Sequence, residues 1–199
     1  GAQGLEVEFD AEQAVIDATR VVLHTQEQAG IDVVCDGELY RFDVNHPETN
    51  GMIEYFVRPM AGIRPDVTFD ELIAYRAQRG MGFRTRPPGV VDSAIDSGTL
   101  DLPLACRRAR SLTKKPFKFT VTGPHMLAKT LVDNHYRDIA KLADAIAEAL
   151  ARQVAHCDAE IVQLDTSKAH ETRRRKLAYR EMLGAAAVLN KRPGWASFL

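Results

Sequence analysis

Three acidic side chains stand where two short buried strands are predicted to end. Asp36 and Glu38 flank a glycine directly after an apolar run at residues 31–35, and Asp165 follows a second run at residues 160–164. In α/β folds the active site lies at the carboxyl ends of the strands, so we expect these carboxylates to lie together at that end of the sheet. There they could bind an amine, a metal ion or a proton in transfer. Helix capping and loop hydrogen bonds are the alternative use of such residues.

Two arginines and a histidine form a second group of candidates. Arg84 and Arg86 lie next to a double proline, which forces an extended backbone, and they could hold an anion such as a folate. His125 follows a Gly-Pro turn that exposes backbone N–H groups at the start of a helix, which also suits an anion. For the arginines, a solvated strand end is the alternative interpretation.

No spacing in the sequence is typical of a metal site. The six histidines form no His-x-x-x-His or His-x-Cys pair, and no Cys-x-x-Cys pair is present. His156 and Cys157 are adjacent, so in a helix their side chains diverge by about 100° and cannot easily share a metal. The odd number of cysteines, at long spacings, argues against a disulfide framework and indicates a reducing compartment. We therefore expect no self-contained metal site.

Charge and missing motifs exclude several classes of function. The chain has 26 basic and 27 acidic residues and a net charge of −1, so we expect neither a nucleic-acid nor a membrane partner. No apolar stretch approaches about 18 residues and no leader opens the chain, which predicts a soluble, cytoplasmic protein. The glycine-rich dinucleotide motif, the P-loop and the Gly-x-Ser-x-Gly hydrolase motif are all missing.

Helices and buried strands are expected to alternate along the chain. Helices are predicted at residues 12–29, 68–78, 100–112, 125–132 and 138–154, and strands at residues 31–35, 118–122 and 160–164. A long loop at residues 40–65 holds a possible strand at 52–57, and residues 168–190 permit a further helix. This alternation predicts a parallel sheet covered by helices. Without a dinucleotide motif, a barrel is favoured over a doubly wound sheet.

Four motifs in this order resemble the cobalamin-independent methionine synthase family, in its C-terminal catalytic barrel. They are residues 32–43 (DVVCDGELYRFD), 86–88 (RPP), 115–124 (KPFK, then TGP) and 161–165 (IVQLD). The resemblance implies a (β/α)8 TIM barrel that moves a methyl group from methyltetrahydrofolate to the thiol of homocysteine. It also implies that Glu38 and Asp165, with Asp36 beside them, bind the substrate amino group. A zinc ion in that family binds the thiol and lowers its pKa.

The chain departs from the family pattern in three ways. Thr166 and Ser167 replace the usual Glu-Pro, nothing matches the zinc ligands, and the first strand with its Gly-Ser-Phe/Tyr-Pro signature is missing. Such a barrel takes about 250 residues, and about half of its strands are found here. We therefore expect a fragment: an incomplete (β/α)8 barrel at residues 1–165, with a helical tail without resemblance at residues 166–199. Alone, it is not expected to activate a thiol, and open strand edges predict self-association.

Two other functions stay open at this point. Epoxyalkane–coenzyme M transferases are similar to the same family, and Arg84 and Arg86 would then bind a sulfonate. A non-catalytic barrel fragment, or a partner subunit whose missing strands come from another chain, is the second alternative.

Overall fold

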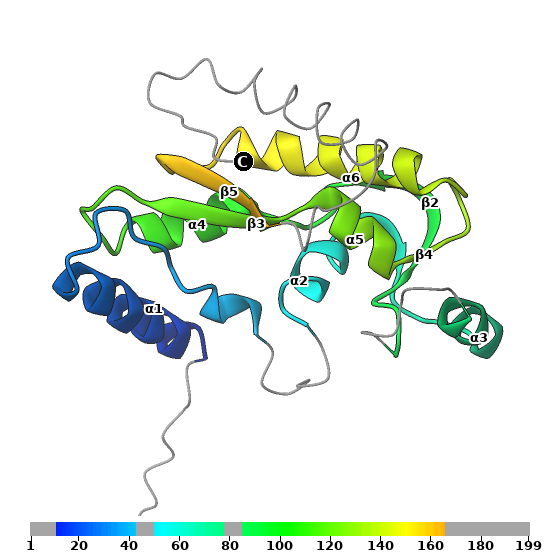
Figure 1. Ribbon diagram of the computed structural model, residues 1–199, viewed down its shortest axis with the longest axis horizontal. Coiled ribbons are helices and arrows are strands. Elements are labelled where there is room, and N and C mark those ends of the chain that lie inside the picture. The colour runs from blue at the N-terminus through cyan, green and yellow to red at the C-terminus, as the bar shows by residue number, and fades with distance from the viewer. Residues whose placement is uncertain (1–10, 43–49, 78–84, 166–199) are drawn as a thin grey trace, which may run out of the picture.

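The computed structural model describes residues 11–42, 50–77 and 85–165, which form a mixed α/β structure (Figure 1). Its helices are α1 Ala11–Gln28, the 3-10 turn η1 Leu39–Arg41, α2 Glu54–Val57, α3 Phe69–Arg76, α4 Leu102–Arg110, α5 Pro124–Thr130 and α6 Ile139–Val154. Its strands are β1 Ala61–Arg64, β2 Val90–Asp96, β3 Lys118–Thr122, β4 Val132–Asp133 and β5 Ile161–Asp165. The predicted α/β class is confirmed. The helix predicted at residues 168–190, and the whole tail at 166–199, lie outside the described residues.

The parallel strands that the sequence predicted are neighbours. β3 and β5 pair in parallel, from Lys118 opposite Ile161 to Thr122 opposite Asp165. On the other edge of β3, Val34 forms a parallel bridge with Phe117. Between β3 and β5 the chain passes through α5, the short strand β4 and α6, which provides the crossover that parallel neighbours require. The spatial order is therefore Val34, β3, β5.

The strand predicted at residues 31–35 is wrong in its extent, because only Val34 pairs with β3. The backbone N–H of Cys35 donates to Gln26 Oε1 at 3.0 Å, and the Gln26 amide donates to the carbonyl of Cys35 at 2.7 Å. A side chain of α1 thus occupies the backbone groups that a longer strand would offer to a neighbour.

A second sheet with the order β1-β2-β4 stands apart from the β3–β5 pair. β1 pairs with β2 antiparallel, and β2 pairs with β4 parallel, so the described residues form two sheets rather than one continuous barrel sheet. The sequence predicted none of these three strands, and β1 lies inside the segment at residues 40–65 that was expected to be a loop. In β2 three consecutive side chains, Asp92, Ser93 and Ala94, are exposed, which hides the alternation that marks a strand.

The strand proposed at residues 52–57 is also wrong, because α2 occupies this segment. The carbonyl of Asn50 accepts the N–H groups of Ile53 and Glu54 at 2.8 and 2.9 Å. The side chain of Asn50 accepts the N–H of Met52 at 2.9 Å, which is an Asx turn. This local turn starts a helix where the apolar pattern alone indicated a strand.

The remaining helix predictions are confirmed with small differences at the ends. Thr68 and Glu71 form the predicted capping box at the start of α3, and Asp138 caps α6. Figure 1 shows α1 at one end of the molecule and α3 at the other. Among the described helices, none combines the length and the apolar character that crossing a membrane requires.

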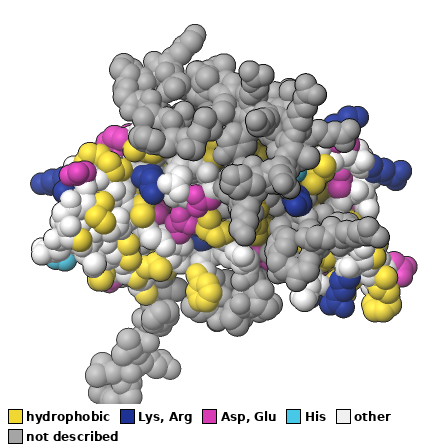
Figure 2. Space-filling view, viewed as in Figure 1, with side chains coloured by type: hydrophobic (Ala, Val, Ile, Leu, Met, Phe, Trp, Pro, Cys, Tyr) yellow, Lys and Arg dark blue, Asp and Glu magenta, His cyan; other side chains and the backbone are white. Residues whose placement is uncertain are grey.

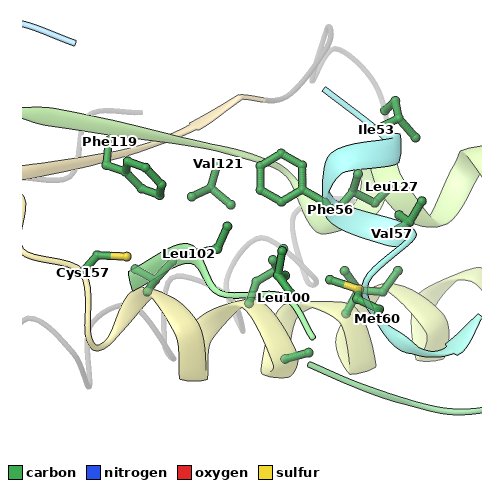
Figure 3. Close-up of a cluster of buried hydrophobic side chains, with 14 of the residues drawn as sticks. Ile53, Phe56, Val57, Met60, Leu100, Leu102, Phe119, Val121, Leu127 and Cys157 are labelled. Carbon is green, nitrogen blue, oxygen red and sulfur yellow. The ribbon is translucent and has the colours of Figure 1, made fainter. Parts of the chain in front are cut away.

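One apolar core joins β3 to the helices around it (Figure 3). Phe119 and Val121 of β3 point toward Leu102 of α4 and Phe56 of α2, and all four side chains are fully buried. Burial of this kind is the main favourable contribution to folding, so the position of β3 depends on these contacts.

Leu102→Ala is expected to lower the free energy of unfolding by about 2–5 kcal/mol, because the substitution leaves a cavity in this core. Leu104→Ala is the matched control, since Leu104 lies on the same helix but is 37% exposed. Its loss should stay below about 1 kcal/mol. Urea denaturation measures both, and equal losses would contradict the described packing.

Candidate functional site

The parallel order Val34, β3, β5 places the predicted carboxylates at one end of the sheet, where the strands finish. The chain leaves Val34 toward Asp36 and Glu38, and β5 ends at Asp165. The carbonyl of Asp165 accepts the N–H of Gly123 at 2.8 Å, which ties the end of β5 to the turn after β3. Acidic side chains gather near the middle of the face shown in Figure 2.

Glu38 lies in a turn whose backbone is left-handed at two successive residues. Gly37 has φ 72° and Glu38 has φ 60°, a conformation that costs a non-glycine residue about 1–2 kcal/mol. A Cβ on Gly37 would lie 2.9 Å from Val22 Cγ1 of α1, so the turn also needs a glycine for space. Asp36 Oδ1 accepts the N–H of Glu38 at 3.2 Å and closes the turn.

The carboxyl group of Asp36 is fully buried, and its Oδ2 has no hydrogen-bond partner within the part of the chain that the structure describes. Burial raises the pKa of Asp36, while the charge of Arg41 and the hydroxyl of Tyr40 act in the opposite direction. Burial also raises the pKa of Tyr40, and the Asp36 carboxylate adds to that effect. The Tyr40 phenol is therefore neutral at physiological pH.

Arg41 is a site residue that the sequence analysis did not select. Its side chain is 1% exposed, and its Nη1 pairs with Glu38 Oε2 at 3.0 Å. Its Nη2 donates to the carbonyl of Thr120 at 2.5 Å and to the Tyr40 hydroxyl at 3.2 Å. The i, i+3 spacing from Glu38 inside the motif at residues 32–43 was the signal that could have identified it.

Four aromatic rings surround the Arg41 guanidinium. Its carbon lies 5.0 to 5.6 Å from the ring centres of Tyr40, Tyr55, Phe56 and Phe119. Rings at this distance attract a cation, and the attraction increases where water is excluded. The aromatic shell and the Glu38 carboxylate together offset the cost of burying this charge.

Asp165 is held by its own strand. Its Oδ1 accepts the Gln163 amide at 2.6 Å, and Gln163 Oε1 in turn accepts Lys118 Nζ at 2.8 Å. Because Lys118 belongs to β3, these bonds cross between the two paired strands. Asp165 is half-buried, so its carboxylate is accessible.

The three candidate anion residues lie in different parts of the chain, and one of them is not described. Arg84 lies outside the described residues. Arg86 is exposed and precedes β2, in the other sheet. His125 is half-buried and is the second residue of α5, directly after the Gly123 turn that bonds to Asp165. Of the two that are described, His125 is connected to the end of β5 through the Gly123 turn.

No metal centre is found in the described ranges, where no group of three or more His, Cys, Asp or Glu side chains could hold an ion. The cysteines Cys35, Cys106 and Cys157 are free, and the latter two are buried. These residues therefore do not fit the zinc site that the family resemblance implies.

Comparisons with known proteins identify the class. Residues 3–191 match the family model of the cobalamin-independent synthase catalytic domain, so the chain belongs to that family. The match extends past Asp165 into the residues predicted to be a tail.

The most similar relatives include a methionine synthase of Sulfurisphaera tokodaii, 29% identical over 167 residues. They also include a 5-methyltetrahydropteroyltriglutamate–homocysteine methyltransferase of Streptomyces griseus, 32% identical over 175 residues. These alignments cover 81% and 83% of this chain, but only 44% and 20% of the relatives. The chain thus spans less than half the length of either relative.

Two solved structures share the fold. One is a B12-independent methionine synthase from Shewanella sp. W3-18-1 in complex with selenomethionine, with a TM-score of 0.57, 21% identity, and coverage of 79% of this chain and 43% of that one. The other is a putative B12-independent methionine synthase from Listeria monocytogenes, with a TM-score of 0.61, 14% identity, and coverage of 96% and 56%.

Asp36→Asn is expected to stabilise the chain at neutral pH. Because the native pKa is raised above the ordinary 3.8, the native state holds a proton that the unfolded state has lost. The stability of the unaltered chain therefore falls as the pH rises from the ordinary pKa of 3.8 to the raised native pKa. The asparagine variant does not titrate and does not show this fall.

Asp96→Asn is the control of opposite sign. The backbone N–H of Ser97 and the Arg152 guanidinium lower the pKa of Asp96, so its charge contributes stability above the ordinary value. This variant should lose stability at neutral pH. Denaturation curves from pH 3.5 to 7 measure both, and an Asp36→Asn variant less stable at pH 7 would contradict the assignment.

Proposed function

We propose that the chain carries the amino-acid-binding part of a methyltransferase of the cobalamin-independent methionine synthase type. Such an enzyme moves a methyl group from methyltetrahydrofolate to the sulfur of a thiol such as homocysteine. The observation that supports this most is the parallel order Val34, β3, β5. It brings the turn with Asp36 and Glu38 to the same edge as Asp165.

The proposed ligand group is the ammonium of the thiol amino acid. A half-buried carboxylate binds an ammonium well, because the charge-assisted hydrogen bond contributes more where water is partly excluded. Among the described residues, Glu38 has one carboxylate oxygen beyond the one paired with Arg41, and Asp165 has one beyond the one that accepts the Gln163 amide. Asp36 is fully buried, so we assign it the role of closing the turn and setting the charge there, rather than direct contact with the ammonium.

Zinc, in this family, would supply a thiolate by lowering the pKa of the bound thiol. No residue described here is assigned to that step, since the available side chains do not form a ligand set. The described carboxylates bind and orient the amino end of the acceptor. His125 and Arg86 remain candidates for the folate, and His125 is favoured because it follows Gly123, whose N–H bonds to the carbonyl of Asp165.

We propose that the two described sheets are parts of one (β/α)8 barrel. Two features support this: the parallel neighbours on both sides of β3, and the connection from β3 to β5 through α5, β4 and α6.

Glu38→Gln and Asp165→Asn are each expected to raise the dissociation constant for homocysteine at least about tenfold. Each removes a bond to a charged group, which is worth about 1.5–3 kcal/mol. Asp17→Asn, an exposed carboxylate paired with Arg20 on α1, is the control and should change nothing. Calorimetric titration measures all four proteins. Unchanged binding in both site variants, or no binding by the unaltered chain, would refute the proposal.

Self-association is the second expected property. Among the residues placed in the structure, Val34 and β5 each pair with β3 alone, which leaves one edge of each without a neighbouring strand. Light scattering should show a mass that rises with protein concentration. A monodisperse monomer that unfolds in one cooperative transition would contradict this expectation.

A further inference from the structure

We propose that Arg41 is a positioning residue, which holds the Glu38 carboxylate in place for the ammonium of the acceptor. The inference rests on the proposed function for its ligand. Its structural basis, the contact between Arg41 and Glu38, does not depend on any ligand.

The guanidinium of Arg41 is fixed in two directions at once. Nη1 pairs with Glu38 Oε2 at 3.0 Å, and Nη2 donates to the backbone carbonyl of Thr120 at 2.5 Å. A planar guanidinium can make both bonds because its donors form a rigid fork, whereas a lysine ammonium is a point charge on a flexible stem. Arg41 therefore sets the distance between Glu38 and β3.

This contact also relates Glu38 to Asp165. Thr120 lies opposite Gln163 in the register of β3 and β5, and the Gln163 amide donates to Asp165 Oδ1 at 2.6 Å. A continuous path of bonds thus runs from Glu38 through Arg41 and the strand pair to Asp165. Two carboxylates that bind one ammonium must keep a fixed separation, and this path can fix it.

The two members of the ion pair differ in exposure. The side chain of Arg41 is 1% exposed and that of Glu38 is 21% exposed. Solvent, and hence a ligand, reaches the carboxylate but not the guanidinium. Arg41 can therefore act on a ligand only through Glu38, which is why we assign it a positioning role rather than direct contact.

Charge balance agrees with this role. Asp36 and Glu38 bring two carboxylates to one turn; Arg41 pairs with Glu38, and its charge also acts on the carboxyl group of Asp36. Without the guanidinium, the carboxylates repel each other and Glu38 is expected to turn toward solvent.

A double-mutant cycle tests the inference with four proteins: the unaltered chain, Arg41→Lys, Glu38→Gln, and the two changes together. NMR titration with L-homocysteine measures affinity, since it follows even millimolar binding. Arg41→Lys should weaken binding about tenfold when Glu38 is present and less than twofold in the Glu38→Gln background. Arg152→Lys, in an exposed pair with Asp96, is the control and should leave the affinity unchanged.

Thermal unfolding without ligand is the second readout on the same proteins. The fall in Tm on Arg41→Lys should be smaller in the Glu38→Gln background, because the partner charge is already gone. Equal effects of Arg41→Lys in both backgrounds, in affinity and in Tm, would overturn the positioning role and leave the proposed function standing. If the unaltered chain binds no homocysteine, the proposed function fails, and the coupling in Tm alone decides whether Arg41 holds Glu38.

Discussion

Five residue pairs join β3 to β5 in parallel, and the positions of the candidate residues follow from this pairing. The pairing places Asp165 opposite Thr122. The bridge between Val34 and Phe117 brings the turn with Asp36 and Glu38 to the same carboxyl end of the strands, on the other side of β3. The core beneath β3 holds this arrangement, because Phe119 and Val121 are fully buried against the surrounding helices. A change in the register of these strands would separate the carboxylates, whatever the residues themselves were.

Burial gives the site its second constraint. A fully buried Asp36 and a nearly fully buried Arg41 would each be costly alone. The burial of Arg41 is tolerated because its guanidinium lies among aromatic rings, and because Glu38 and Thr120 accept its hydrogen bonds. The left-handed backbone at Glu38 adds strain at the same place. Strain and buried charge at one turn are typical of a binding site, since neither contributes to stability.

Parts of this arrangement were readable in the sequence because they depend on local signals. The apolar runs before Asp36 and Asp165 predicted strand ends, and the capping box of Thr68 and Glu71 predicted the start of α3 correctly. The segment at residues 52–57 misled because it is a short run in which every residue but Glu54 is apolar or aromatic, as in a buried strand. Its helix depends on hydrogen bonds that Asn50 accepts, and a hydrophobic pattern gives no sign of them.

For Arg41 the sequence offered only a spacing, three residues after Glu38, and not its burial. Arginines are mostly exposed, so a single arginine in a motif carries no sign of burial. Its place becomes clear only when tertiary contacts bring Phe119 and Thr120 of β3 against it. The family relation itself was readable from four ordered motifs, whereas the division into two sheets required the structure.

The central claim is that Glu38 and Asp165 face one amino-acid site at the ends of Val34 and β5. A crystal of the chain soaked with selenomethionine tests it most directly, because the anomalous signal of selenium locates the ligand independently of its density. The account predicts a selenium peak beside this edge, with the ligand nitrogen about 2.7–3.2 Å from a carboxylate oxygen of each residue. A selenium peak elsewhere, or Glu38 and Asp165 facing different sides of the sheet, would contradict it.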